Sequence, residues 1–178
     1  GERLIICSMP RGDKMALSDG MKLIITPQEI QEIVKRLASE ISAGYNGKNP
    51  VLIGALKASF IFLSDLSRSL ALEHELDFIQ TSSYGRADSP SHEVLITGDI
   101  STDVRDRHCI VVDSIIDRGK TANAIEEHLK KKGPSSVRLC ALLLRSGDAE
   151  LLVKADYVGK RIGKGFVAGY GMDYKERL

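Results

Sequence analysis

Hydrophobic residues recur at helical spacing in three stretches of the chain. The first begins with the capping box Thr26-Pro27-Gln28-Glu29, which has proline at the first helical position, and continues with apolar side chains at Ile30, Ile33, Val34, Leu37 and Ile41. This pattern predicts a helix that ends near residues 44–47. The same spacing predicts helices over residues 59–72 and 119–132, the last of them stopped by Gly133-Pro134.

Short apolar runs bounded by turn residues predict buried strands between these helices. They cover residues 50–56, 76–82, 94–97, 108–113 and 137–144, and two shorter strands are expected near residues 157 and 166–168. Strands that alternate with helices indicate an α/β domain with a largely parallel sheet. Residues 1–25 carry only two short apolar pieces, so we interpret them as an N-terminal extension before one domain over residues 26–178.

The bulk composition excludes several classes of protein. The 178 residues are 43% hydrophobic and 28% charged, as in one globular domain, and the net charge of +1 gives no general attraction to nucleic acid or to an anionic membrane. No apolar run approaches the roughly 18 residues that a membrane-spanning helix needs. Three separated cysteines without a CxxC pair indicate neither zinc nor a redox couple, and the expected location is the cytoplasm.

The candidate chemistry lies where the strand over residues 108–113 leads into the next helix. Asp113 ends the strand, and a second acid, Asp117, precedes Arg118-Gly119-Lys120-Thr121 at the start of the helix. Ligands of open α/β sheets bind beyond the carboxyl ends of strands, and a helix N-terminus offers unpaired amides and a partial positive charge. The segment therefore predicts a phosphate site, with the acids facing ribose hydroxyls or a magnesium ion.

The segment allows two other interpretations. Gly119-Lys120-Thr121 matches the end of a Walker A loop, but that motif needs glycine where the chain has Ser114. The bulky Ile115 and Ile116 and the anionic Asp117 also disfavour a loop that wraps a phosphate. In the second interpretation the segment is an ordinary strand–turn–helix in which Asp117 only caps the helix.

From about Ile24 onward the chain resembles the hypoxanthine (guanine) phosphoribosyltransferases, which are type I phosphoribosyltransferases. Four segments carry the resemblance: Gly54–Phe60, Asp77–Gly85, Val111–Thr121 and Gly165–Tyr174. The resemblance implies a central, mostly parallel sheet flanked by helices, with a small hood over the base. It also implies purine salvage, in which hypoxanthine or guanine and phosphoribosyl pyrophosphate give IMP or GMP and pyrophosphate with the help of Mg²⁺.

The resemblance assigns a role to residues of each segment. Residues of the first two segments bind pyrophosphate (Lys57, Ala58) or form a flexible loop that closes over the transition state (Ser83, Tyr84). The signature binds phosphoribosyl pyrophosphate and its 5′-phosphate through Asp113, Asp117, Arg118, Gly119, Lys120 and Thr121, and Asp117 is the catalytic base at purine N7. The purine is bound by Arg145, Phe166, Val167 and Asp173, and the metal by Asp113 and Asp173.

Several positions depart from the family pattern. Ser114 stands where the family has a second acid, which predicts a weaker ribose or metal contact, and Arg118 stands in place of threonine or serine. Ala58 replaces a glycine, and Arg145 replaces a lysine that reads the exocyclic oxygen of the purine, with a longer and planar fork.

These departures leave alternative functions open. One is a weakly catalytic regulator that binds a nucleotide or phosphoribosyl pyrophosphate, and another is a transferase for xanthine or a pyrimidine. The small-molecule substrates are the expected partners, together with further copies of the chain in a homodimer or homotetramer, as is common among related enzymes.

Overall fold

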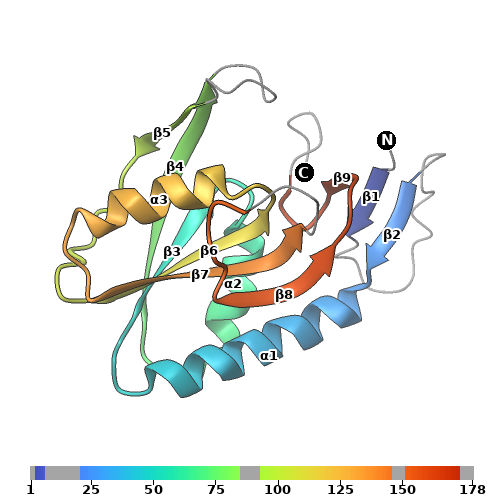
Figure 1. The fold of residues 1–178 in the computed structure, drawn as a ribbon. Coiled ribbons are helices and arrows are strands. Elements are labelled where there is room, and N and C mark those ends of the chain that lie inside the picture. The colour runs from blue at the N-terminus through green and yellow to red at the C-terminus, as the bar shows by residue number, and fades with distance from the viewer. Residues whose placement is uncertain (1–2, 7–20, 85–92, 146–150, 173–178) are drawn as a thin grey trace.

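The computed structural model describes residues 3–6, 21–84, 93–145 and 151–172. Its centre is a six-stranded sheet with the order β5-β4-β3-β6-β7-β8 (Figure 1). The strands are β3 (Val51–Leu56), β4 (Glu75–Tyr84), β5 (Glu93–Gly98), β6 (His108–Ile116), β7 (Ser136–Arg145) and β8 (Tyr157–Ile162). All neighbouring strands are parallel except β4 and β5, which confirms the predicted, mostly parallel sheet.

Three helices cover the two faces of this sheet. Helices α1 (Pro27–Tyr45) and α2 (Phe60–Ser69) share one apolar core with Val112 and Leu142 of the sheet. Helix α3 (Lys120–Lys130) packs on the opposite face with Val111 and Leu139. The neighbouring residues Val111 and Val112 of β6 thus pack into cores on opposite faces of the sheet, because side chains alternate between the faces of a strand.

The start of α1 follows the predicted capping box. The Thr26 hydroxyl accepts a hydrogen bond from the Glu29 backbone N–H at 3.2 Å, and the Thr26 backbone N–H donates to the Glu29 carboxylate at 2.8 Å. Two N–H groups that a helix start leaves unpaired are thereby satisfied. None of the helices in the described ranges is long and apolar enough to cross a membrane.

A second, three-stranded sheet has the order β2-β1-β9 and lies beside the main sheet (Figure 1). Strands β1 (Arg3–Ile6) and β2 (Met21–Ile25) come from the segment interpreted as an N-terminal extension, and β1 pairs in parallel with β9 (Phe166–Ala168). The described parts of this segment are therefore joined to the C-terminal half of the chain. This small sheet is the hood implied by the resemblance.

Strand β6 is longer than the hydrophobic pattern indicated. Ile115 and Ile116 continue the pairing with Leu143 and Leu144 of β7, so the strand ends at Ile116 and not at Asp113. Backbone pairing with β7 thus extends past the polar residues that interrupt the apolar run. Asp113 and Ser114 consequently lie within the strand, and Asp117 is the first residue beyond it.

Candidate active site

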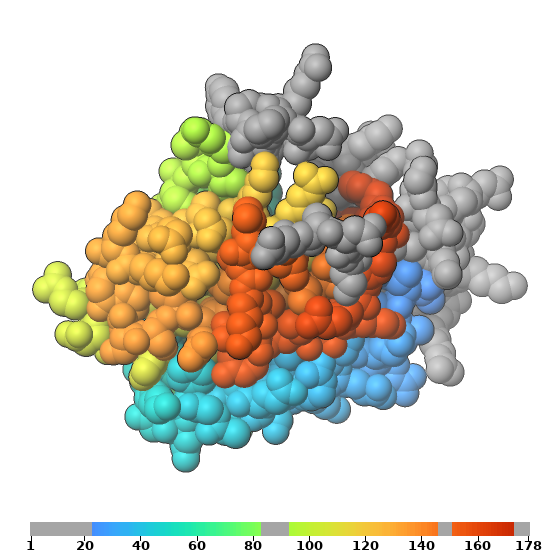
Figure 2. Space-filling view, viewed as in Figure 1, coloured from blue at the N-terminus to red at the C-terminus, as the bar shows by residue number. Residues whose placement is uncertain are grey.

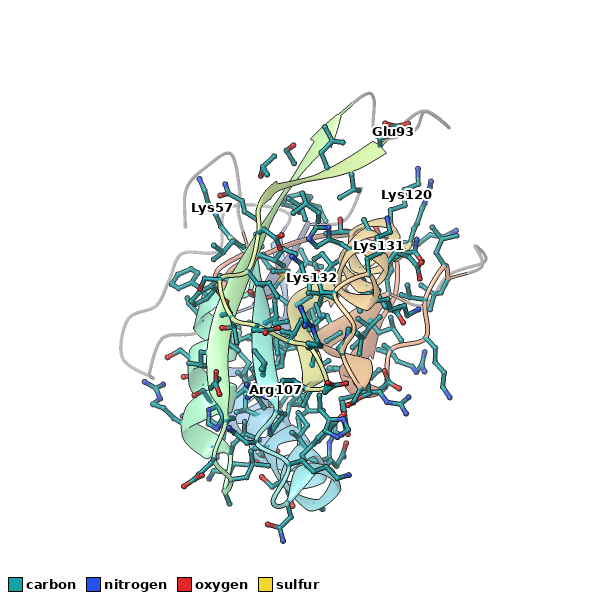
Figure 3. The ribbon with its side chains drawn as sticks, turned by 90° about the vertical axis from the view of Figure 1, so that its left-hand side faces the viewer. Lys57, Glu93, Arg107, Lys120, Lys131 and Lys132 are labelled. Atoms are coloured by element: carbon teal, nitrogen blue, oxygen red, sulfur yellow. The ribbon has the colours of Figure 1, made fainter. Side chains whose placement is uncertain are left out.

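The loops that follow β3 and β6 leave the same edge of the main sheet, because these strands are neighbours and parallel. Lys57 and Lys120, which follow β3 and β6, both lie at this end in Figure 3. Figure 1 shows β9 at the same end, and in Figure 2 the yellow atoms that follow β6 stand beside the red atoms of the C-terminal segment. The fold thus brings together segments that are far apart in the sequence, at the edge where parallel sheets bind ligands.

The turn between β6 and α3 depends on Gly119. This residue is the N-cap of α3 and has φ +82°, in the left-handed region that glycine adopts without steric cost. A Cβ atom at this position would lie only 2.8 Å from Cγ2 of Val153. The segment around Val153 also holds the turn through a hydrogen bond of 3.2 Å from the Leu152 N–H to the Arg118 carbonyl. The hydrophobic pattern gave no indication of this contact.

No side chain of the described residues caps the N-terminus of α3. Asp117 therefore does not act as the helix cap, which was one of the alternative interpretations of the segment. The first turn of a helix has N–H groups without intrahelical partners and a partial positive charge. With Lys120 and Thr121, both half-buried, this turn has the features of an anion site.

The two acids of the signature have different environments. Asp113 is half-buried, and burial raises the pKa of its carboxyl to about 6, although the backbone N–H groups of Ile115 and Ser114 donate to it. The Asp117 side chain is 61% exposed at the end of the strand. Asp113 can thus contact a ligand held against the sheet, while Asp117 is open to a ligand that arrives from solvent.

Arg145 lies against Asp117. Its Nε atom is 3.1 Å from Oδ1 of Asp117, and its Nη1 donates a hydrogen bond of 2.7 Å to the carbonyl of Gly163. Only 16% of the Arg145 side chain is exposed, so the guanidinium is fixed between the ends of β6 and β8. A residue predicted to bind purine and the predicted base therefore meet directly.

The loop between β3 and α2 contains the predicted pyrophosphate residues. Lys57 is exposed and follows a cis peptide bond after Leu56, and Ala58 is half-buried. The Ala58 carbonyl accepts a hydrogen bond of 2.8 Å from the hydroxyl of Ser114 in β6. Both positions depart from the family pattern, but the sequence did not indicate that they contact each other.

The remaining predicted residues fall into two groups. In the hood strand β9, Phe166 is 50% exposed while Val167 is buried in the core, as alternation along a strand requires. Ser83 and Tyr84 end β4, but their side chains lie outside the described part of the structure, and so does Asp173. Among the described residues no three acidic, histidine or cysteine side chains form a metal-binding group.

Comparison with known families gives a consistent match. Residues 24–175 match the model of the phosphoribosyl transferase domain. The hypoxanthine phosphoribosyltransferase of Buchnera aphidicola is 39% identical over 158 residues, which cover 88% of this chain and 89% of that protein. The bifunctional protein TilS/HprT of Listeria innocua is 36% identical over 93% of this chain, which spans only 26% of that longer protein.

Solved structures support the same relationship. The hypoxanthine phosphoribosyltransferase of Trypanosoma cruzi has a TM-score of 0.82 and 33% identity, with 94% of this chain and 89% of that chain covered. A hypoxanthine-guanine phosphoribosyltransferase from Bacillus anthracis, with a HEPES molecule in its active site, has a TM-score of 0.80 and 35% identity, with 84% and 88% covered. The similarity therefore extends to the arrangement of the elements as well as to the motifs.

Proposed function

Since the chain belongs to the hypoxanthine phosphoribosyltransferase family, we propose that it is a purine salvage enzyme. It transfers the phosphoribosyl group of phosphoribosyl pyrophosphate to hypoxanthine or guanine, giving IMP or GMP and pyrophosphate. The observation that carries this proposal is the ion pair between Arg145 and Asp117 at the carboxyl edge of the sheet.

This ion pair matches one edge of a 6-oxopurine. The O6 and N7 atoms of guanine lie on the same edge of the base. Arg145 has only donors and suits the O6 oxygen, and the carboxylate of Asp117 suits a proton on N7. Adenine has an amino group in place of O6, so that Arg145 would face another donor. The pairing therefore favours hypoxanthine and guanine over adenine, with Phe166 and the backbone of Val167 contacting the base from the hood.

The phosphoribosyl group occupies the turn between β6 and α3. The unpaired N–H groups of the first turn of α3, with Lys120 and Thr121, hold the 5′-phosphate, and Gly119 allows its close approach. Arg118, which is exposed, adds a positive charge beside the phosphate. The half-buried Asp113 faces the ribose hydroxyls.

The chemical step replaces one bond at C1′ of ribose by another. N9 of the purine forms a bond to C1′ while the C1′–O bond to pyrophosphate breaks, and pyrophosphate leaves with its electron pair. Asp117 takes the proton from N7, a task that contributes typically ~10²–10⁴-fold to the rate. Lys57 neutralises charge on the departing pyrophosphate, and the fixed positions of base and ribose supply further acceleration.

The acids of this site fit a magnesium ion. The Asp113 carboxylate offers the oxygen ligands that Mg²⁺ prefers, and Asp173 is the second candidate ligand. Phosphate oxygens of the substrate would supply further ligands of the same kind. When bound, the ion supplies charge neutralisation on the pyrophosphate.

A homo-oligomer, either a dimer or a tetramer, is part of the same proposal. It is supported by exposed apolar side chains of α2 and β4, namely Phe60, Leu76 and Phe78. Large exposed apolar side chains are typical of protein contact surfaces when they gather in one patch. A cytoplasmic location likewise stays a prediction.

A substrate panel tests the proposal. The full chain is mixed with magnesium, phosphoribosyl pyrophosphate and one base at a time (hypoxanthine, guanine, xanthine, adenine or uracil), and nucleotide formation is followed. We expect turnover with hypoxanthine or guanine and little with adenine or uracil. Binding of phosphoribosyl pyrophosphate without turnover of any 6-oxopurine would contradict the enzymatic function.

A further inference from the structure

Ser114 and Ser59 are the two fully buried polar side chains in the described part of the chain. The Ser114 hydroxyl donates a hydrogen bond of 2.8 Å to the backbone carbonyl of Ala58. This bond joins the signature strand β6 to the loop between β3 and α2, which presents Lys57. The two segments are separated by more than fifty residues in the sequence, so the contact is a tertiary one.

The C-terminal segment encloses the same carbonyl. A Cβ atom built on Gly171 would lie 2.7 Å from the Ala58 oxygen and 3.3 Å from the ring of Phe60. Gly171 also has φ +89°, a conformation that disfavours other residues. The Ala58 carbonyl is therefore packed against Gly171, and within the described ranges Ser114 is its hydrogen-bond donor.

The direction of this carbonyl fixes the backbone of the loop. A peptide group is planar, so the neighbouring Ser59 N–H must point away from the Ala58 oxygen. It donates to the Ala55 carbonyl at 3.3 Å, and the Ser59 carbonyl accepts from the Leu63 N–H at 2.8 Å. The loop thereby leads directly into the first turn of α2, and Lys57 is left exposed at its tip.

The chemical type of residue 114 matters for this contact. A hydroxyl can donate a proton, whereas an ionised carboxylate can only accept one. An ionised acid at position 114 would set two acceptors against each other at the Ala58 carbonyl. The serine thus suits a contact with the loop, and this contact explains its burial.

On the basis of the proposed function, we propose that Ser114 is a positioning residue for pyrophosphate. Its hydroxyl holds the loop of residues 57–59 in the conformation that presents Lys57 and the backbone of Ala58 to the pyrophosphate group of the substrate. It acts through the loop and does not touch the purine or the 5′-phosphate. Loss of the hydroxyl should therefore weaken the binding of pyrophosphate and leave the binding of a nucleoside monophosphate unchanged.

The test compares two ligands on the full chain by calorimetric titration in the presence of magnesium. One ligand is pyrophosphate, and the other is GMP, which carries base, ribose and 5′-phosphate but no pyrophosphate. We expect Ser114→Ala to raise the dissociation constant of pyrophosphate about tenfold, the effect of losing one buried hydrogen bond. GMP affinity should stay within about twofold of wild type. In turnover, KM for phosphoribosyl pyrophosphate should rise more than kcat falls.

Two further variants separate positioning from general stability. Ile110→Val removes one methylene from another fully buried residue of β6 and lowers stability without touching the loop. Ser114→Cys keeps a weak donor of similar size and should bind pyrophosphate better than Ser114→Ala. If the alanine variant does not fold, the pyrophosphate affinity of Ser114→Cys is compared with that of wild type. The weaker donor should then raise the dissociation constant of pyrophosphate and leave GMP affinity unchanged.

The outcomes are distinct. Equal pyrophosphate affinity in wild type and Ser114→Ala, or an equal loss in Ile110→Val, overturns the positioning role. A parallel loss of GMP affinity also overturns it, because the serine would then support the whole site. If the wild-type protein binds neither pyrophosphate nor phosphoribosyl pyrophosphate, the proposed function itself fails.

Discussion

Asp113 and Asp117 are four residues apart, and their environments suit them to different tasks. Asp113 is held within β6, where burial raises its pKa to about 6. Asp117 follows the strand, is largely exposed and is contacted by Arg145. A carboxylate that handles a proton needs access to the substrate, whereas one that orients ribose or a cation needs a fixed position. The division of roles that we propose follows this difference in environment.

The raised pKa of Asp113 predicts the sign of a pH effect on stability. The folded protein holds this proton more tightly than the unfolded chain does, so the free energy of unfolding falls as pH rises from 3.8 to about 6. Asp113→Asn removes this titration. We expect the stability of the variant relative to wild type to increase across this window and then to level off, as measured by urea unfolding at a series of pH values.

Asp77 provides a control, because its pKa is shifted in the direction opposite to that of Asp113. Burial would raise its pKa, but hydrogen bonds to the carboxylate, including one of 2.7 Å from the Thr102 N–H, lower it overall. The stability that ionised Asp77 contributes is lost as pH falls through its lowered pKa. Asp77→Asn should therefore lose stability relative to wild type at neutral pH. If the Asp113→Asn and wild-type curves run parallel, the pKa of Asp113 is the same in the folded and the unfolded chain, and its assigned environment is wrong.

Among the secondary-structure elements, the start of α3 and the loop before α2 form the candidate site. Both follow neighbouring parallel strands, which brings their backbone groups to one edge. Residues 151–153, which are not part of any motif, support the turn before α3 through Leu152 and Val153. A phosphate site of this type depends on backbone placement as much as on the side chains of the signature.

Gly119→Ala tests the dependence on backbone placement. The new Cβ would lie 2.8 Å from Cγ2 of Val153, and φ +82° is unfavourable for alanine, so we expect a loss of about 1–3 kcal/mol in the free energy of unfolding. Displacement of the turn should also weaken the binding of phosphoribosyl pyrophosphate.

Gly47→Ala is the matched control, because Gly47 also has a positive φ of +73° but its Cβ would have no atom within 4 Å. Thermal melts and titrations of both variants measure the two effects. Similar behaviour of the two variants would show that Gly119 has no special structural role.

The sequence predicted most elements because their signals are local. The capping box at Thr26 and the spacing of apolar residues located α1, and apolar runs located β3, β6 and β7 to within a few residues. The contact between Ser114 and Ala58 could not be predicted in this way, since it depends on the side-by-side placement of β3 and β6. The pairing of Arg145 with Asp117 could not be predicted either, because it depends on the placement of β7 beside β6.

At the scale of the whole molecule, the two ends of the described chain meet in the hood. Strand β1 pairs with β9, although one lies near the first residue and the other near the last (Figure 1). The short apolar pieces at the N-terminus showed no strong periodicity, and the pairing is entirely long-range, so the sequence suggested an extension. The hood strand that carries Phe166 thus depends on N-terminal residues for its neighbours.

The central claim is that this edge of the sheet transfers a phosphoribosyl group to a 6-oxopurine with Asp117 as the base. The most direct test is a single-turnover measurement, in which protein saturated with magnesium and phosphoribosyl pyrophosphate is mixed with hypoxanthine and IMP formation is timed. Asp106→Asn, an exposed aspartate before β6, is the matched control. We expect wild type and Asp106→Asn to form IMP at the same rate, and Asp117→Asn to be slower by ~10²–10⁴-fold with nearly intact affinity for phosphoribosyl pyrophosphate. Equal rates for Asp117→Asn and wild type would contradict the account.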